Sequence, residues 1–161
     1  MPAPYPMPHL DSLKVEIKQP RANKQKMADV GLEGVELLDV LSQFEEFGIW
    51  RLDIDDGLVY FSEDASALHG LAPAKGAVDL AAAVRAYHPE DRHHFMECLE
   101  DAITRKAGFR FILRIGDGSD GEHSEVLEVA GRYRTNPLGR PELFGTVRQL
   151  KMRVRTVSLD A

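Results

Sequence analysis

Residues 48–71, GIWRLDIDDGLVYFSEDASALHGL, carry the pattern that decides the fold class. From Trp50 to Asp55, apolar and polar residues alternate, which is the period-two pattern of a half-buried strand. Asp56-Gly57 predicts a tight turn into a second strand, LVYF. Ser62 can cap the short helix that follows. The stretch therefore predicts a hairpin and then a helix.

The rest of the chain extends this pattern to an α+β plan. Helical patterns at residues 77–87 and 89–106 follow the hairpin. Three strand patterns come next, FRFILRI, SEVLEVAGRYR and LFGTVRQLKMRV, and polar turns separate them. Two strands, several helices and three further strands predict helices gathered beside an antiparallel sheet.

The region before the hairpin divides into two parts. Residues 1–30, with prolines at positions 2, 4, 6 and 8, predict a flexible Pro-rich and polar tail. Residues 31–47 predict an N-terminal cap or dimerisation helix, because their apolar positions cover a broad half of a helical wheel. The candidate interface residues on that half are Leu37, Val40, Leu41, Phe44 and Phe47. We expect the main domain to span 48–155, with a short C-terminal tail at 156–161.

The composition excludes several classes of protein. At 161 residues, with 43% apolar and 29% charged residues, the chain suits one globular domain with tails. A net charge of −6 argues against a nucleic-acid surface. No apolar run is long enough to span a bilayer, and the N-terminus lacks the pattern of a signal peptide. With one cysteine, the chain is expected to be cytoplasmic.

The stretch YHPEDRHHFMEC, residues 87–98, raises the question of a metal, haem or thiol site. A helix beginning at Pro89 puts His93 and His94 on the polar face, away from a pocket, and no zinc-ligand spacing is present. Cys98 falls on the apolar face, where a thiol behaves as a small hydrophobe. We expect no haem, no metal and no cofactor, and we expect His88 to cap the helix or pack at its start.

Four segments together resemble the successive signatures of the PAS domain family. They are GIWRLDIDDGLVYFSEDASALHGL, YHPEDR, FRFILRI and GRYRTNPLGRPELFGTV, in order over about residues 47–154. The second resembles the family branch whose helix starts with His-Pro-x-Asp-Arg. The resemblance implies a five-stranded antiparallel sheet with small helices on one face, which enclose a pocket. It also implies sensory or interaction work in signalling, often with dimerisation through a preceding helix.

The chain also departs from the family pattern. Glu125-Val126 stands where an Arg-Trp pair is frequent, and Gln149 and Lys151 stand where an Asp and a Thr usually couple the sheet to an output helix. The Asn-Cys-Arg motif of the light-sensing subfamily is missing, so we do not expect flavin photochemistry. Because few residues follow Lys151, we expect no attached output domain.

Two functions compete, and an enzyme is a distant third because no nucleophile–base constellation is present. The first is a free-standing bacterial PAS signalling protein that acts in trans, as a homodimer, on a histidine kinase or another member of a two-component or cell-cycle pathway. The second is a sensor or buffer for a small molecule. The candidate pocket residues, for which core packing is the alternative role, are Trp50, Leu52, Tyr60, Phe95, Leu99, Phe111, Leu113 and Val129.

Overall fold

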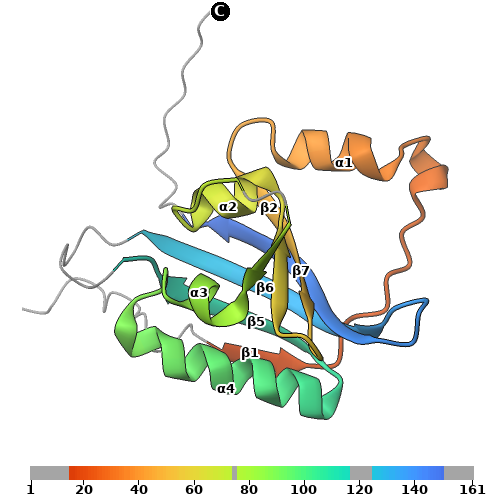
Figure 1. Cartoon of the computed structure of the whole chain (residues 1–161). Coiled ribbons are helices and arrows are strands. Elements are labelled where there is room, and N and C mark those ends of the chain that lie inside the picture. The colour runs from red at the N-terminus through yellow and green to blue at the C-terminus, as the bar shows by residue number, and fades with distance from the viewer. Residues whose placement is uncertain (1–14, 74–75, 117–124, 151–161) are drawn as a thin grey trace, which may run out of the picture.

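The computed structural model describes residues 15–73, 76–116 and 125–150 (Figure 1). Its elements in chain order are β1 (Val15–Lys18), the 3-10 helix η2 (Met27–Val30), α1 (Gly34–Leu41), β2 (Phe47–Asp53), β3 (Leu58–Phe61), α2 (Glu63–Leu68), β4 (Ala77–Asp79), α3 (Leu80–Val84), α4 (Pro89–Arg105), β5 (Gly108–Arg114), β6 (Val126–Thr135) and β7 (Pro141–Gln149).

The strands form one antiparallel sheet in the order β1-β5-β6-β7-β2-β3-β4. The five central strands are those that the sequence predicts, and the α+β fold class is confirmed. Two short strands extend the sheet, so the expected count of five is too low. One of them, β4, covers the first three residues of the helix expected at 77–87. These residues form a strand because Val78 pairs with Val59, and the helix α3 begins only after Asp79, which caps it.

The other added strand, β1, corrects the predicted tail. Residues 15–18 pair with β5, with Ile17 opposite Phe109, and Ile17 packs against the core. An alternation of only four residues is too short to be recognised as a strand in a polar segment. Strand β1 is stabilised by its pairing with β5. Residues 1–14 and the predicted tail at 156–161 lie outside the described residues.

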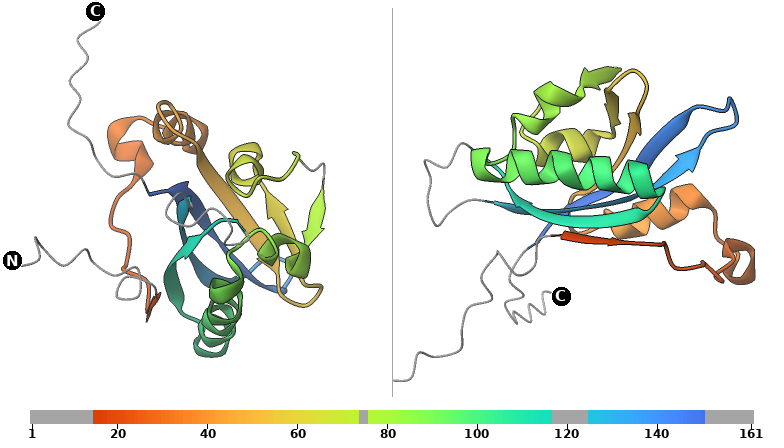
Figure 2. Two further views of the ribbon diagram at one scale, coloured as in Figure 1. Left: turned by 90° about the vertical axis from the view of Figure 1, so that its left-hand side faces the viewer. Right: turned by 90° about the horizontal axis from the view of Figure 1, so that it is seen from below.

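Helices α2, α3 and α4 cover one face of the sheet (Figure 2, right). The core lies between that face and the helices, and it includes Phe95, Leu99, Leu127, Leu143 and Val147. We call this the inner face and the opposite one the outer face. Because side chains alternate along each strand, only every second strand residue can reach the core.

The His-Pro-Glu-Asp-Arg segment fixes the start of α4 through backbone contacts. His88 is the N-cap, and its Nδ1 accepts a hydrogen bond from the backbone N–H of Glu90 at 3.1 Å. Pro89 occupies the first helical turn, where its missing N–H costs nothing. Arg92 donates to the carbonyl oxygens of Tyr87 and Arg85, each at 2.9 Å. The predicted capping role of His88 therefore matches the structure.

The N-terminal helix is shorter than the predicted span of 31–47. Glu33 and Glu36 form a capping box at its start, and it ends at Leu41. Ser42 is its C-cap, and the Ser42 hydroxyl donates a second hydrogen bond to the Leu38 carbonyl oxygen, which already accepts the Ser42 N–H. Phe47 is not on the helix at all. It begins β2, paired with Arg148 of β7, so its assignment to the helix face is wrong.

Candidate functional site

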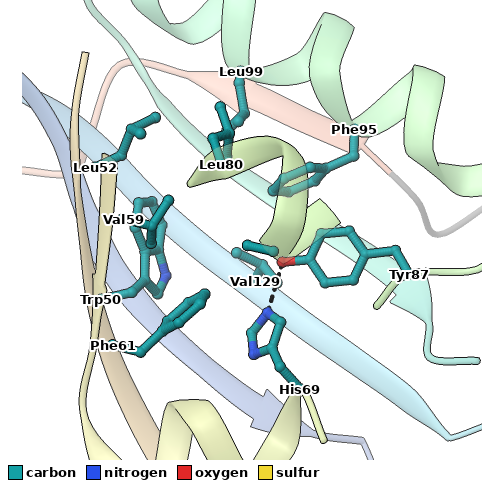
Figure 3. Close-up of a pocket in the computed structure, with 11 residues that line it drawn as sticks. Trp50, Leu52, Val59, Phe61, His69, Leu80, Tyr87, Phe95, Leu99 and Val129 are labelled. Atoms are coloured by element: carbon teal, nitrogen blue, oxygen red, sulfur yellow. Dashed lines mark hydrogen bonds between the residues drawn. The ribbon is translucent and has the colours of Figure 1, made fainter. Parts of the chain in front are cut away.

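A small cavity lies between the inner face of the sheet and the helices (Figure 3). Its volume is about 20 Å³. Apart from one polar pair, its walls are apolar side chains from β2, β3, α3, α4 and β6. The lining residues are Trp50, Leu52, Val59, Phe61, His69, Leu80, Ala83, Tyr87, Phe95, Leu99 and Val129.

Five of the eight candidate pocket residues line this cavity, namely Trp50, Leu52, Phe95, Leu99 and Val129. Phe111 and Leu113 are buried on the inner face of β5 but do not line the cavity, so their role is core packing. Tyr60 is 37% exposed and lies on the outer face, because alternation along β3 puts Val59 inward. The expectation that Tyr60 faces the core is wrong.

The polar pair in the wall is His69 and Tyr87, which the sequence analysis did not select. His69 is the C-cap of α2, and Tyr87 precedes α4. His69 Nε2 lies 2.7 Å from the Tyr87 hydroxyl, and His69 Nδ1 lies 2.7 Å from the Ala65 carbonyl oxygen. Since a carbonyl only accepts, Nδ1 carries the proton and the tyrosine hydroxyl donates to Nε2. The sequence offered one signal, a histidine that follows a short apolar helix.

Burial shifts the pKa of each group in the direction that favours its neutral form. It lowers the pKa of His69, against a smaller opposing effect of the Ala65 carbonyl, and it raises the pKa of Tyr87. A neutral pair with each polar atom partnered is stable in an apolar wall. The pair therefore acts as a fixed polar feature at neutral pH.

The size of the cavity limits what it can hold. About 20 Å³ exceeds the roughly 10–15 Å³ that a water molecule needs. It is far below the roughly 300–1,000 Å³ of pockets for drug-sized ligands. In this conformation the cavity has room for a water-sized guest beside the His69–Tyr87 pair.

We expect the stability of the protein to fall between about pH 7 and pH 5 because of His69. Its pKa in the folded state is below the unfolded value of about 6.5, so the unfolded chain binds more protons in this range. The contribution of His69 to the unfolding free energy is fully present above the pKa that His69 has in the unfolded chain, and it is lost as the pH falls below that value. The slope is at most about 1.4 kcal/mol per pH unit, and urea unfolding at several pH values measures it.

The variant His69→Gln provides the control for this pH dependence. It removes the buried imidazole and leaves the exposed His93 and His94 in place. The slope of unfolding free energy between pH 5 and pH 7 should be smaller in the variant than in the wild type. Equal slopes would contradict the assignment to His69.

The reactive-looking residues of α4 are placed as the helical wheel predicts. The side chains of His93 and His94 are exposed, and both lie near the carboxylate of Glu97. Cys98 is buried, and burial followed by the carboxylate of Asp101 raises the pKa of its thiol to about 12. Since the thiolate is the nucleophile, Cys98 is unreactive at neutral pH. In the described ranges, no group of three or more His, Cys, Asp or Glu is arranged to hold a metal ion.

A second feature is an exposed apolar surface on and beside α1. None of the helix residues is buried. Leu37, Val40 and Leu41 are exposed, and Phe44, just beyond the helix, is 92% exposed. We call these four residues the α1 surface. They are the predicted interface residues other than Phe47.

Within the part of the chain that the structure describes, no helix is long and apolar enough to cross a bilayer. No protein-family model matches the chain, and no curated protein matches it. Solved structures do match, and all of those described next are under 25% identical, so their likeness concerns the fold.

Three structures illustrate that likeness. An RNA-binding Light-Oxygen-Voltage receptor is 18% identical over 71% of this chain and 32% of its own, with a TM-score of 0.55. The N-terminal domain of a diguanylate cyclase with a PAS/PAC sensor from Marinobacter aquaeolei is 16% identical, covering 64% and 94%, with a TM-score of 0.52. A sensory box histidine kinase/response regulator from Burkholderia thailandensis is 16% identical, covering 73% and 85%, with a TM-score of 0.54. The chain thus spans about a third of the first structure and most of the other two.

Proposed function

Because the chain has the PAS fold, we propose that it is a signalling PAS domain that acts in trans through protein–protein contact. The observation that carries this proposal is the α1 surface. The finer assignment to the His-Pro-x-Asp-Arg branch rests on residues 88–92, which cap and anchor α4. No catalytic role is proposed for any residue.

The α1 surface is costly to leave in water. Burying a leucine or phenylalanine side chain is worth roughly 1.5–3 kcal/mol, and contiguous exposed apolar patches mark interaction sites. The capping box at Glu33 and Glu36 satisfies backbone N–H groups at the start of the helix. It favours the helical form of α1, and a helix that is already formed binds at a lower entropy cost.

The proposed contacts are a second copy of the chain and a histidine kinase of a bacterial two-component pathway, including cell-cycle pathways, in the cytoplasm. The kinase is proposed because a similar fold occurs in a sensory box histidine kinase/response regulator. Fold alone does not fix function, so the partner needs a direct test.

A small-molecule sensor or buffer is the second candidate, and the His69–Tyr87 pair favours it. A hydrogen-bonded polar pair in an apolar wall is the kind of feature that orients a ligand. The cavity of about 20 Å³ weighs against it, because a larger ligand must first separate the helices from the sheet. Any such ligand must bind the opened form more tightly than the closed one.

The test compares three proteins, the wild type, Phe44→Glu and Leu138→Glu. Leu138 lies in the β6–β7 turn and is 86% exposed, so it is a matched control outside α1. We expect the wild type and Leu138→Glu to be dimers at tens of micromolar and to recover an identified histidine kinase from native cytosol. Phe44→Glu should be monomeric by ultracentrifugation and should lose the kinase, with an unchanged circular dichroism spectrum.

Two results would contradict the proposal. One is a monomeric wild type that recovers no signalling protein. The other is a tightly held small molecule in native mass spectra of the wild type, with no kinase recovered, which would support the buffer instead.

A further inference from the structure

A groove with a volume of about 560 Å³ lies at the end of the sheet where α4 finishes and β5 begins. One wall is the linker that follows β1, which reaches this end because Lys18 pairs with Gly108, the first residue of β5 (Figure 1). The other walls come from the end of α4 and from β6. We call it the basic groove, and its lining residues are Gln19, Pro20, Arg21, Ala22, Asn23, Lys106, Arg132 and Tyr133.

The basic groove is positively charged in a chain whose net charge is −6. Arg21, Lys106 and Arg132 line it, all three are exposed, and no carboxylate is among the described residues of its walls. Within the described residues, none of these three cations forms an ion pair. Other arginines do pair with carboxylates, namely Arg51, Arg110, Arg114, Arg134, Arg140 and Arg148. Three of the cations that the described chain leaves unpaired are thus gathered in one groove.

Lys106 has a backbone conformation that favours glycine. It follows α4 with φ 50° and ψ 47°, and in the described part of the chain no other residue except glycine has a positive φ. The Ala107 N–H donates to the Ala102 carbonyl oxygen at 2.9 Å, which is the helix ending that a glycine usually completes. Arg105 already supplies a cation for the helix dipole. A residue held in an unfavourable conformation at the surface indicates a use for its side chain, here an ammonium group in the basic groove.

The layout of the basic groove favours an extended acidic segment over a single small anion. Its three cations come from the linker, from the end of α4 and from β6, and each is a long, exposed side chain. Such cations contact several separate charges, whereas a small ligand is held by a few polar groups in a site that encloses it. The amides of Gln19 and Asn23 add groups that can bond to a peptide backbone.

A nucleic acid fits the basic groove less well than a peptide. Single strands usually bind by stacking their bases on aromatic side chains. The aromatic side chain in the wall is Tyr133, and the Lys106 ammonium lies over its ring, 5.9 Å from the centre. That face of the ring is therefore occupied, and the net negative charge of the chain repels a long polyanion.

We infer that the basic groove binds an acidic segment, rich in aspartate and glutamate, of a partner protein. Opposite charges on two surfaces speed their encounter and fix their register. The inference rests on the proposed action in trans. It adds a contact surface that shares no residue with the α1 surface, and it gives the chemistry of the partner segment.

The test measures the binding of fluorescein-labelled hexaglutamate to the whole chain by fluorescence anisotropy at low salt. The wild type should bind this peptide, and its affinity should fall as salt is added, because exposed charges are screened. Arg21→Gln and Arg132→Gln should each weaken binding about threefold, which is the scale of one exposed charge contact. The triple variant with Arg21→Gln, Lys106→Gly and Arg132→Gln should lose binding.

Lys106→Gly separates binding from folding. Glycine adopts this backbone conformation without strain, so the variant should be at least as stable as the wild type in urea unfolding. It should nevertheless weaken hexaglutamate binding about threefold. Arg85→Gln is the matched control, because Arg85 is exposed, forms no ion pair among the described residues and lies beyond the other end of α4, a helix about 25 Å long. This control should bind as the wild type does.

Three outcomes would overturn the inference. The first is equal binding of hexaglutamate by the wild type and the triple variant. The second is an equal loss in Arg85→Gln and Lys106→Gly, which would mean that net charge alone controls binding. The third is tighter binding of single-stranded oligothymidylate than of hexaglutamate by the wild type, which would indicate a nucleic-acid site instead.

The recovery of a kinase from native cytosol distinguishes this inference from the proposed function. If the wild type binds hexaglutamate as expected but recovers no signalling protein, the basic groove stands and the proposed kinase partner fails. If the triple variant recovers the kinase as the wild type does, and hexaglutamate binds neither protein, the proposed function stands and the inference is overturned.

Discussion

Replacing Gly145 with alanine is expected to cost the protein about 3 kcal/mol or more of its unfolding free energy. Gly145 lies at the centre of β7, between Trp50 of β2 and Gly131 of β6. A Cβ on Gly145 would overlap the Ala130 carbonyl oxygen and approach the Gly131 Cα at 2.5 Å. These are backbone atoms, so relief requires the strands to move apart. Overpacking that side chains can absorb costs about 1–3 kcal/mol, and this one lies at or above that range.

Trp50 explains why glycines occupy this site. A Cβ on Gly131 would meet the Trp50 ring at 2.6 Å, so the ring fills the space that a side chain would take. Its indole N–H donates to the Thr146 carbonyl oxygen at 3.0 Å, which fixes the ring against the glycine pair. Since Trp50 also lines the cavity, a shift of β7 would change the cavity wall.

Gly34→Ala is the matched control for Gly145→Ala. Gly34 is the first residue of α1, and a Cβ there meets nothing within 4 Å. Alanine is favoured over glycine in helices, so this change should be neutral or slightly stabilising. Urea unfolding followed by circular dichroism measures both variants. A loss at Gly145 no larger than 1 kcal/mol would show that the sheet accommodates the methyl group.

The sequence predicts the central sheet because its signals are local. Alternation in β2, β3, β5 and β6 and the turn at Asp56-Gly57 do not depend on distant residues. Strands β1 and β4 were missed because three or four residues carry too little pattern, and each forms only beside a longer strand. Tertiary pairing decides such segments, and a single sequence does not show it.

The candidate site was predicted in part for a similar reason. Apolar residues with strong periodicity, such as Trp50, Leu52 and Phe95, were found. His69 and Tyr87 are 18 positions apart, and only the packing of α2 against the segment before α4 brings them together. No spacing rule marks that pair. In the N-terminal helix, the apolar periodicity predicts a helix that continues through Phe47. Phe47 instead pairs with Arg148 and belongs to the sheet.

Replacing Asp91 with alanine is expected to cost about 3–5 kcal/mol, because it leaves part of a buried ion pair without its partner. Asp91 is 3% exposed and accepts three hydrogen bonds from Arg114, one from the backbone N–H and two from the guanidinium, at 2.9–3.1 Å. These bonds raise the pKa of Arg114. Arginine stays protonated even without a partner, so in the variant its charge persists and must be solvated again.

Glu90→Ala is the matched control, since Glu90 contacts the same guanidinium at 3.2 Å from an exposed position. An exposed ion pair contributes about 1 kcal/mol at most. The loss of unfolding free energy should therefore be several times larger for Asp91→Ala than for Glu90→Ala. The contrast matters for the site because Asp91 holds the start of α4 on β5, beside the Tyr87–Ile115 bridge. Loss of that anchor frees Tyr87 to leave His69, and the pH dependence of stability between pH 5 and 7 should weaken along with it. If Asp91→Ala costs no more than Glu90→Ala, the buried pair does not anchor α4.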